Sequence, residues 1–469
     1  MATLTQIKAG TRRRAPSPRM DIDTLLAKYD LRVPRYTSYP TAPQFRPEID
    51  AATYAGWLKA LPDGVPISLY LHVPFCAELC WYCGCHTTAV RSRAPLDAYA
   101  DMMLAEIDLV AAAIGRRLPA AHVHWGGGTP HALPEELLAL IMERLRRAFA
   151  IGAEAEIAVE IDPRTADAAV LDGLAAMGVT RASLGVQDFD PKVQQAVNRI
   201  QSYEQTLACA TRLRARGIRS INLDLIYGLP HQTKAGFAET VRRALDIAPD
   251  RVAVFGYAHV PWMKRHQTLI HEADLPGLGE RHRQMQAAHA VLTGAGYVAV
   301  GLDHYARPGD ALAQAATEGE LHRNFQGYTT DAAPALIGLG VSAIGSLPQG
   351  YVQNAAALPD YRARVRAGQL ATVRGVTLEG EDRLRRDVIE QLMCQGRVDL
   401  VETAARHGRD AAVFADAAPA LSKLAADGVI SWNGPVVAMQ PDAQVLVRAV
   451  ASVFDAYHRP EARRHAPAV

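Results

Sequence analysis

The chain has 469 residues, 49% of them hydrophobic, and its 50 basic and 49 acidic residues leave a formal net charge of +1. This length exceeds what one ordinary hydrophobic core organises, so we expect two or three structural units. A chain so close to neutrality has no global field that would gather nucleic acid or an anionic membrane, and we expect neither as a partner.

Residues 1–65 precede the regular part of the chain and form a predicted N-terminal extension. Its start, MATLTQIKAGTRRRAPSPRM, contains Arg12, Arg13, Arg14 and Arg19 before the first acid, Asp21. Such a start is typical of a mitochondrial transit peptide or of a disordered tail. We favour the tail, with about the first 20 residues disordered. Because the start lacks the apolar run of a secretory signal, we expect a cytoplasmic protein.

From residue 66, short apolar runs alternate with longer amphipathic segments. The predicted strands are 67–73, 121–126, 156–161, 181–186, 221–227 and 251–257. A helix is predicted over 96–114, where apolar residues recur every three or four positions. Six βα units in series predict an α/β fold with a parallel sheet and right-handed crossovers. We expect a partial (β/α)6 barrel over 66–350, with YVAVGL near residue 297 as a further apolar run.

Residues 351–469 are predicted to form a mostly helical domain. Helical patterns in EDRLRRDVIEQLM and QVLVRAVASVFDAY flank GVISWNGPVVAM, which predicts a hairpin turning at Asn433–Gly434. Helices followed by such a hairpin resemble a winged-helix module. The neutral charge favours packing against the barrel over contact with DNA.

Polar and special residues lie in or directly after the predicted strands, near the carboxyl ends where ligands gather in folds of this kind. The cysteines follow the first strand and Gly126–Gly128 follow the second, Glu160 and Asp162 close the third, Gln187 follows the fourth, Asp224 lies within the fifth, and Tyr257 and His259 end the sixth. Each could instead cap the helix that follows it. The shared position at one rim predicts a single site.

Four of the six cysteines lie within ten residues, directly after the first predicted strand. Cys76, Cys80 and Cys83 follow the spacing C-x-x-x-C-x-x-C, which allows three thiolates on one loop to hold a [4Fe–4S] cluster with one iron left open. A structural zinc site that also uses Cys85 or a nearby histidine is the main alternative, and a redox disulfide is weaker. No second CxxC knuckle is present, which favours the cluster.

The motif resembles the radical S-adenosylmethionine (SAM) superfamily, whose CxxxCxxC follows the first strand of a partial barrel. This resemblance implies that the open iron binds SAM, whose cleavage yields a 5′-deoxyadenosyl radical. A glycine-rich loop such as WGGGTP suits close approach of the backbone to a ligand. Taken alone that loop is weak evidence, because a tight turn after a strand needs glycine anyway.

A closer resemblance is to the oxygen-independent coproporphyrinogen III oxidase family. It is carried by RYTSYPTAPQF, LYLHVPFCAELCWYCGCHT, HWGGGTP, EIDPR, SLGVQDF, NLDLIYGLP, GLDHYARP, LHRNFQGYTT and GVSAIG, in the family's order. The resemblance implies oxidative decarboxylation of two propionates of coproporphyrinogen III to vinyl groups, giving protoporphyrinogen IX for haem synthesis. It also implies two bound SAM molecules, an electron donor and a final electron acceptor.

Residue roles follow from the same resemblance. The cluster ligands match Cys76, Cys80 and Cys83. The contacts to the cluster-bound SAM match Tyr70, Tyr82, Gly127, Glu160 and Ile344. The contacts to the second SAM match Gly128, Thr129, Gln187, Arg199, Asp224 and Ala258. Tyr82 stands where well-known members carry phenylalanine, which keeps the ring.

Cys85 separates the oxidases from the similar haem-chaperone family, which has an aromatic residue there and lacks RYTSYP. This chain has both Cys85 and Arg35–Pro40, so we expect an oxidase in which Cys85 has a catalytic role beside the cluster. A zinc-dependent nucleic-acid-binding protein is a more distant rival. We expect a monomer, with Arg35 as a candidate to hold a substrate propionate.

Overall fold

The computed structural model describes residues 20–29 and 33–458 and is built around one twelve-stranded sheet. Six consecutive parallel strands form its centre, and each overlaps a predicted strand. They are β1 (Ile67–Val73), β4 (Pro119–Gly127), β5 (Ala150–Ile161), β6 (Arg181–Gln187), β7 (Ser220–Tyr227) and β8 (Arg251–Gly256). The predicted α/β fold with six βα units is confirmed.

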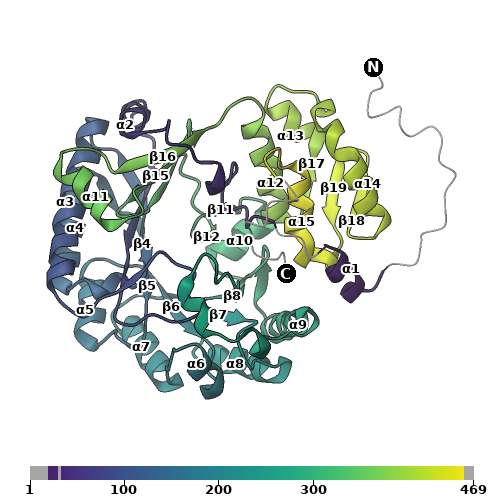
Figure 1. Ribbon diagram of the computed structural model, residues 1–469, viewed down its shortest axis with the longest axis horizontal. Helices are drawn as coiled ribbons and strands as arrows, with labels where there is room; N and C mark the ends of the chain where they lie inside the picture. Colours follow the sequence, from purple (N-terminus) through teal and green to yellow (C-terminus); the bar gives the residue numbers. More distant parts are fainter. Residues whose placement is uncertain (1–19, 30–32, 459–469) are drawn as a thin grey trace.

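Helices cover the outer face of these strands (Figure 1). They are α3 (Ala94–Ile114), α4 (Glu135–Ala148), α5 (Ala168–Ala176), α6 (Pro191–Ala196), α7 (Tyr203–Ala215), α8 (Lys234–Asp246) and α9 (Leu278–Gly294). The main core fills the layer between helices and sheet, with Trp125 and Phe237 almost fully buried. The inner face is polar, because alternate strand residues such as His124, Asn222 and Asp224 point into the barrel.

Additional strands extend both edges of the parallel sheet. β13 (Leu336–Leu339) is parallel to β1 and is followed by antiparallel β14 (Ile344–Leu347), β15 (Gly350–Asn354) and β16 (Thr372–Thr377). The other edge is β10 (His304–Ala306) and then β9 (Val298–Val300), which is the run predicted near residue 297. Since β16 and β9 lie at opposite ends of the strand order, the barrel is open.

The last quarter of the chain forms a second lobe beside the barrel (Figure 1). It contains α12 (Asp382–Gln395), α13 (Leu400–Arg406), α14 (Ala418–Ala426), α15 (Val447–Ala451) and a sheet of β17 (Arg397–Asp399), β19 (Val436–Met439) and β18 (Ile430–Asn433). The predicted hairpin forms, but its turn is Gly434–Pro435, because Asn433 pairs with Val436. Gly434 has the positive φ of 66° that the first turn position needs. The winged-helix class itself stays a prediction.

The N-terminal segment packs partly on this second lobe. Leu26 of α1 (Ile22–Tyr29) belongs to the same core as Phe454, and the Tyr36 hydroxyl donates to Asp455 at 3.0 Å. Further along, α2 (Ala51–Lys59) packs on α3 instead. The predicted disordered tail and its arginines lie outside the described residues.

Short elements complete the fold. They are β2 (Phe75–Cys76), β3 (Thr88–Ala89), α10 (Ala311–Glu318), β11 (His322–Asn324), β12 (Gly327–Thr329) and α11 (Leu358–Arg366). The predicted domain limit at residue 350 falls within the main sheet, because β15 and β16 continue that sheet to Thr377. The domain limits of 1–65, 66–350 and 351–469 stay a prediction. No helix in the described ranges is long and apolar enough to cross a membrane.

Candidate functional site

The cysteine loop leaves the carboxyl end of β1 and borders a cavity of about 620 Å3, which we call the cysteine cavity. Cys76, Cys80 and Cys83 all line it. Loops after the neighbouring strands supply the other walls, because the carboxyl ends of parallel strands share one rim. Most residues predicted at this rim therefore line one cavity, and their shared function stays a prediction.

The backbone of the cysteine loop is held by two later segments. After α6, the Val197 carbonyl accepts from the Trp81 amide at 3.0 Å, and the Asn198 side chain donates to the Leu79 carbonyl at 3.1 Å. These bonds engage the backbone and leave the thiols to face the cavity.

A second anchor was not found from the sequence. Lys264, His266 and Gln267 donate to the carbonyls of Cys85, Cys83 and Tyr82 at 2.8, 2.7 and 2.9 Å. The segment VPWMKRHQ has no periodicity or motif that signals this role. Only the folded chain brings it to the loop.

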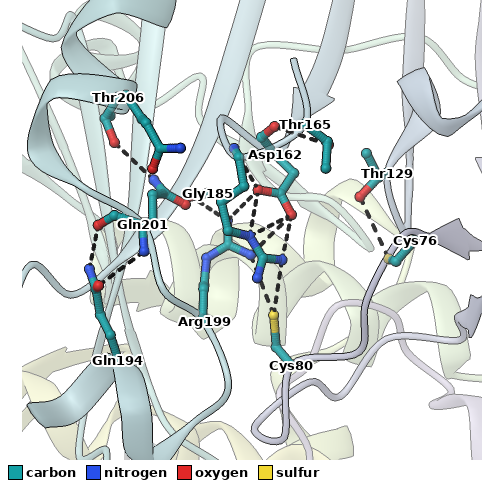
Figure 2. Close-up of polar contacts among 12 residues, drawn as sticks. Cys76, Cys80, Thr129, Asp162, Thr165, Gly185, Gln194, Arg199, Gln201 and Thr206 are labelled. Atoms are coloured by element: carbon teal, nitrogen blue, oxygen red, sulfur yellow. Dashed lines mark hydrogen bonds and ion pairs between the residues drawn. The ribbon is translucent and has the colours of Figure 1, made fainter. Parts of the chain in front are cut away.

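Arg199 is buried between Asp162 and the Cys80 thiol (Figure 2). Its guanidinium lies 3.2 Å from Asp162 Oδ1, 3.5 Å from Cys80 Sγ and 2.6 Å from the Gly185 carbonyl. Arg164 reaches the same two partners, at 2.6 Å from Asp162 Oδ2 and 3.4 Å from Cys80 Sγ. Burial alone would raise the pKa of Asp162, but the charges of both arginines lower it to about 2.

The glycine loop after β4 is packed too closely to accept side chains. A Cβ on Gly127, where φ is 114°, would lie 2.7 Å from the His72 ring, and one on Gly128 would lie 2.6 Å from the Phe75 carbonyl oxygen. The neighbouring Thr129 hydroxyl lies 3.6 Å from Cys76 Sγ. These glycines and Thr129 line the cysteine cavity. Their backbone is held in place, because the Gly128 amide donates to the Val73 carbonyl at 2.8 Å and the Thr129 amide donates to the Phe75 carbonyl at 2.7 Å.

Three polar residues predicted to belong to this rim also line the cavity. Glu160 accepts from the Gly127 amide at 3.1 Å and from His124 at 3.2 Å; burial alone would raise its pKa, but these partners lower it. Asp224 accepts from Ser183 at 2.8 Å, and burial raises its pKa. Gln187 ends β6 at a φ of 71°, a strained conformation often associated with functional sites.

The remaining predicted residues divide into two groups. Tyr82 and Ala258 line the cysteine cavity, whereas Tyr70 and Ile344 are not among its lining residues. Tyr70 lies inside the barrel, with its hydroxyl 3.0 Å from His72 Nδ1. Ile344 on β14 packs against an apolar cluster that contains Tyr351.

Cys85 is exposed and lines both the cysteine cavity and a second cavity beside it. Its closeness to Cys83 raises its own pKa well above the ordinary value and lowers that of Cys83 to about 7. In the described ranges, no group of three cysteine, histidine or acidic side chains lies close enough together to hold a single metal ion.

Comparisons with known proteins identify the family of the chain. The sequence profile of the radical SAM superfamily matches residues 70–244. An oxygen-independent coproporphyrinogen III oxidase of Bradyrhizobium diazoefficiens is 52% identical over 96% of this chain and 100% of its own length. The corresponding protein of Paracoccus denitrificans is 44% identical over 92% of this chain and 96% of its own. A solved structure of coproporphyrinogen III oxidase from Escherichia coli, described as a radical SAM enzyme, is 40% identical and superposes with a TM-score of 0.88, covering 94% of this chain and 100% of that one.

Proposed function

The chain belongs to the oxygen-independent coproporphyrinogen III oxidase family of radical SAM enzymes, and on that premise we propose that it converts coproporphyrinogen III to protoporphyrinogen IX in anaerobic haem biosynthesis. Two propionate side chains are decarboxylated oxidatively to vinyl groups. The observation that carries this proposal is a full-length match to such oxidases in a chain whose Cys76, Cys80 and Cys83 line one cavity.

Cys76, Cys80 and Cys83 are the residues that would hold a [4Fe–4S] cluster. Soft thiolates are the ligands that such clusters take. The N–H groups of Arg164 and Arg199 against Cys80 Sγ provide hydrogen bonds of the kind that tunes a cluster's potential. This donor set fits the cofactor.

We assign SAM binding to the residues around the cluster loop. Tyr70, Tyr82, Gly127, Glu160 and Ile344 are proposed for the cluster-bound SAM, and Gly128, Thr129, Gln187, Arg199, Asp224 and Ala258 for a second SAM. Arg199 supports this assignment best, because its Nε is buried without a hydrogen-bond partner and can still bind a carboxylate. Tyr70 and Ile344, which lie off the cavity lining, are its weakest members.

The overall reaction requires two redox partners. Each propionate, –CH2–CH2–COO⁻, becomes –CH=CH2 and carbon dioxide, so it loses one hydrogen atom and one electron. The bound cluster and SAM, reduced by one electron from a donor, supply the radical chemistry that removes the hydrogen atom. The remaining electron passes to an acceptor. We propose that Cys85, beside the cluster ligands, acts on the substrate side of this step.

We further propose that the protein acts as a monomer in the cytoplasm. All six cysteines are free thiols, which suits a reducing compartment.

The test is an anaerobic assay with coproporphyrinogen III, SAM and a reductant, after reconstitution with iron and sulfide. We expect four irons and four sulfides per chain by the stoichiometry of the cluster, and protoporphyrinogen IX as product. Stoichiometric zinc without sulfide, or an intact cluster that cleaves SAM but forms no product from coproporphyrinogen III, would contradict the proposal.

A further inference from the structure

A second cavity of about 340 Å3 shares a wall with the cysteine cavity. Four arginines line it, so we call it the arginine cavity. They come from distant segments: Arg35 from the N-terminal segment, Arg281 from α9, Arg323 from β11 and Arg448 from α15. Arg35, Arg448 and Cys85 line both cavities. A molecule that fills the arginine cavity would therefore reach the cysteine loop.

The positive charge of this cavity is not balanced by its own lining. Asp303 is the only acidic side chain among the lining residues of the described chain. Within the ranges 20–29 and 33–458, Arg35, Arg281 and Arg323 form no ion pair. Their nearest polar contacts are neutral: Arg35 donates to the Gly256 carbonyl at 3.4 Å, and Arg281 donates to the Tyr257 carbonyl at 2.8 Å.

Some of these guanidinium groups also have buried N–H groups without partners. They are Nε of Arg281 and both Nε and Nη1 of Arg323. Burial lowers the pKa of Arg35, a shift that Asp303 opposes and Arg323 reinforces. Buried cations that face one another are costly unless an anion joins them. Such a cluster in a folded protein therefore indicates a bound polyanion.

The shape of a guanidinium points to the kind of anion. Its planar fork binds a carboxylate through two parallel hydrogen bonds. A ligand that presents several carboxylates would engage several of these arginines at once. The substrate of the proposed reaction carries four.

We infer that the arginine cavity binds the carboxylates of the tetrapyrrole that are not reacting, and so directs one propionate into the cysteine cavity. This inference rests on the proposed function. It assigns Arg281 and Arg323 as substrate-positioning residues. It also explains why segments from both ends of the chain meet at this rim of the barrel. Because each turnover removes carboxylates, the product is held by fewer contacts than the substrate.

The probe is coproporphyrin III, the stable oxidised form of the substrate, titrated anaerobically into the reconstituted enzyme. Its tetramethyl ester, which has the same ring and no charge, measures the contribution of the ring alone. Arg281→Gln and Arg323→Gln should each raise the Kd of coproporphyrin III, and the KM of coproporphyrinogen III, about tenfold. The affinity for the ester, the iron content and kcat at saturation should change little. Arg323→Lys should recover part of the loss.

Arg283→Gln is the matched control. Arg283 also lies on α9 but is half-exposed and pairs with Glu280 at 2.8 Å, away from the cavity lining. This variant should bind and turn over substrate like the wild type.

The test separates the inference from the proposed function. If the wild-type enzyme is active and both glutamine variants keep its KM and its affinity for coproporphyrin III, the inference about the arginine cavity is wrong while the proposed function stands. Equal weakening of coproporphyrin III and of its ester would also overturn it, because the loss would then come from the fold. A wild-type enzyme that forms no protoporphyrinogen IX would overturn the proposed function, whatever the variants do.

Discussion

The cysteine cavity and the arginine cavity share a wall that includes Arg35 and Arg448, but the arginines that line only one of the two cavities differ in their partners. In the cysteine cavity, Arg164 and Arg199 are both paired with Asp162. In the arginine cavity, Arg281 and Arg323 have no carboxylate partner within the described chain. Paired charges hold a structure together, whereas like charges gathered without partners cost stability and are typical of a site that awaits a ligand.

Loss of a cluster ligand should have the largest effect on activity. It should also separate catalysis, which depends on the cysteine cavity, from porphyrin binding, which depends on the arginine cavity. Cys80→Ala should remove the cluster and abolish product formation, while the affinity for coproporphyrin III stays within a few-fold of the wild type. Iron and sulfide analysis, product chromatography and porphyrin titration measure the three outcomes. Cys209→Ala is the control, because burial raises the pKa of Cys209 to about 12 and keeps it a neutral packing residue. Loss of porphyrin binding in Cys80→Ala would mean that the cavities do not act separately.

The paired and unpaired arginines should differ next in stability. Asp162→Asn leaves two buried guanidinium groups without their carboxylate and should cost about 3–5 kcal/mol of unfolding free energy. Arg323→Gln should cost less, about 1 kcal/mol, because Arg323 has no ion pair within the described chain and loses mainly its contact with the Tyr328 ring. Denaturant unfolding of the two variants beside the wild type measures this. Equal losses of unfolding free energy in the two variants would contradict the difference that we describe between the two cavities.

The pH dependence of stability follows from the same carboxylate. The pKa of Asp162 is lowered from 3.8 to about 2 in the folded protein. A carboxyl with a lowered folded pKa contributes stability that is fully present above its ordinary pKa, near 4, and is lost as the pH falls through about 2. Asp162→Asn should lack this part of the acid sensitivity between pH 4 and pH 2.

Cys85 lies on the wall between the cavities, and its replacement should have an intermediate effect. Cys85→Ser should keep the cluster and the SAM-induced change in its EPR spectrum, while forming protoporphyrinogen IX about 100-fold more slowly. Complete loss of iron from this variant, with iron retained in Cys83→Ser, would show that the ligands are assigned wrongly.

Tyr82→Phe should give the smallest effect. Tyr82 lines the cysteine cavity, and phenylalanine keeps its ring while removing one hydroxyl. We expect a change in kcat/KM worth less than about 1 kcal/mol. Tyr82→Ala is the companion variant, and its kcat/KM should be much lower than that of Tyr82→Phe. If Tyr82→Phe were as impaired as Tyr82→Ala, the hydroxyl and not the ring would carry the contact.

The sequence by itself determined the features that depend on neighbours along the chain. The six parallel strands were predictable because each is a short β-rich run. The cysteine loop was predictable because three thiols within eight residues, after a strand, have few other uses. The position of Glu160, Gln187 and Asp224 at one rim then followed from the shared direction of parallel strands.

Tertiary structure decided the features that join distant segments. Asp162 was placed at the rim from the sequence, but its pairing with Arg199 depends on a loop 37 residues away. The bonds from Lys264, His266 and Gln267 to the cysteine loop span about 180 residues (179 for Lys264). The arginine cavity joins Arg35 to Arg448, residues at opposite ends of the chain. The physical reason is that a lone arginine in a sequence carries no sign of what will surround it, and only folding decides whether its charge meets a carboxylate or another arginine.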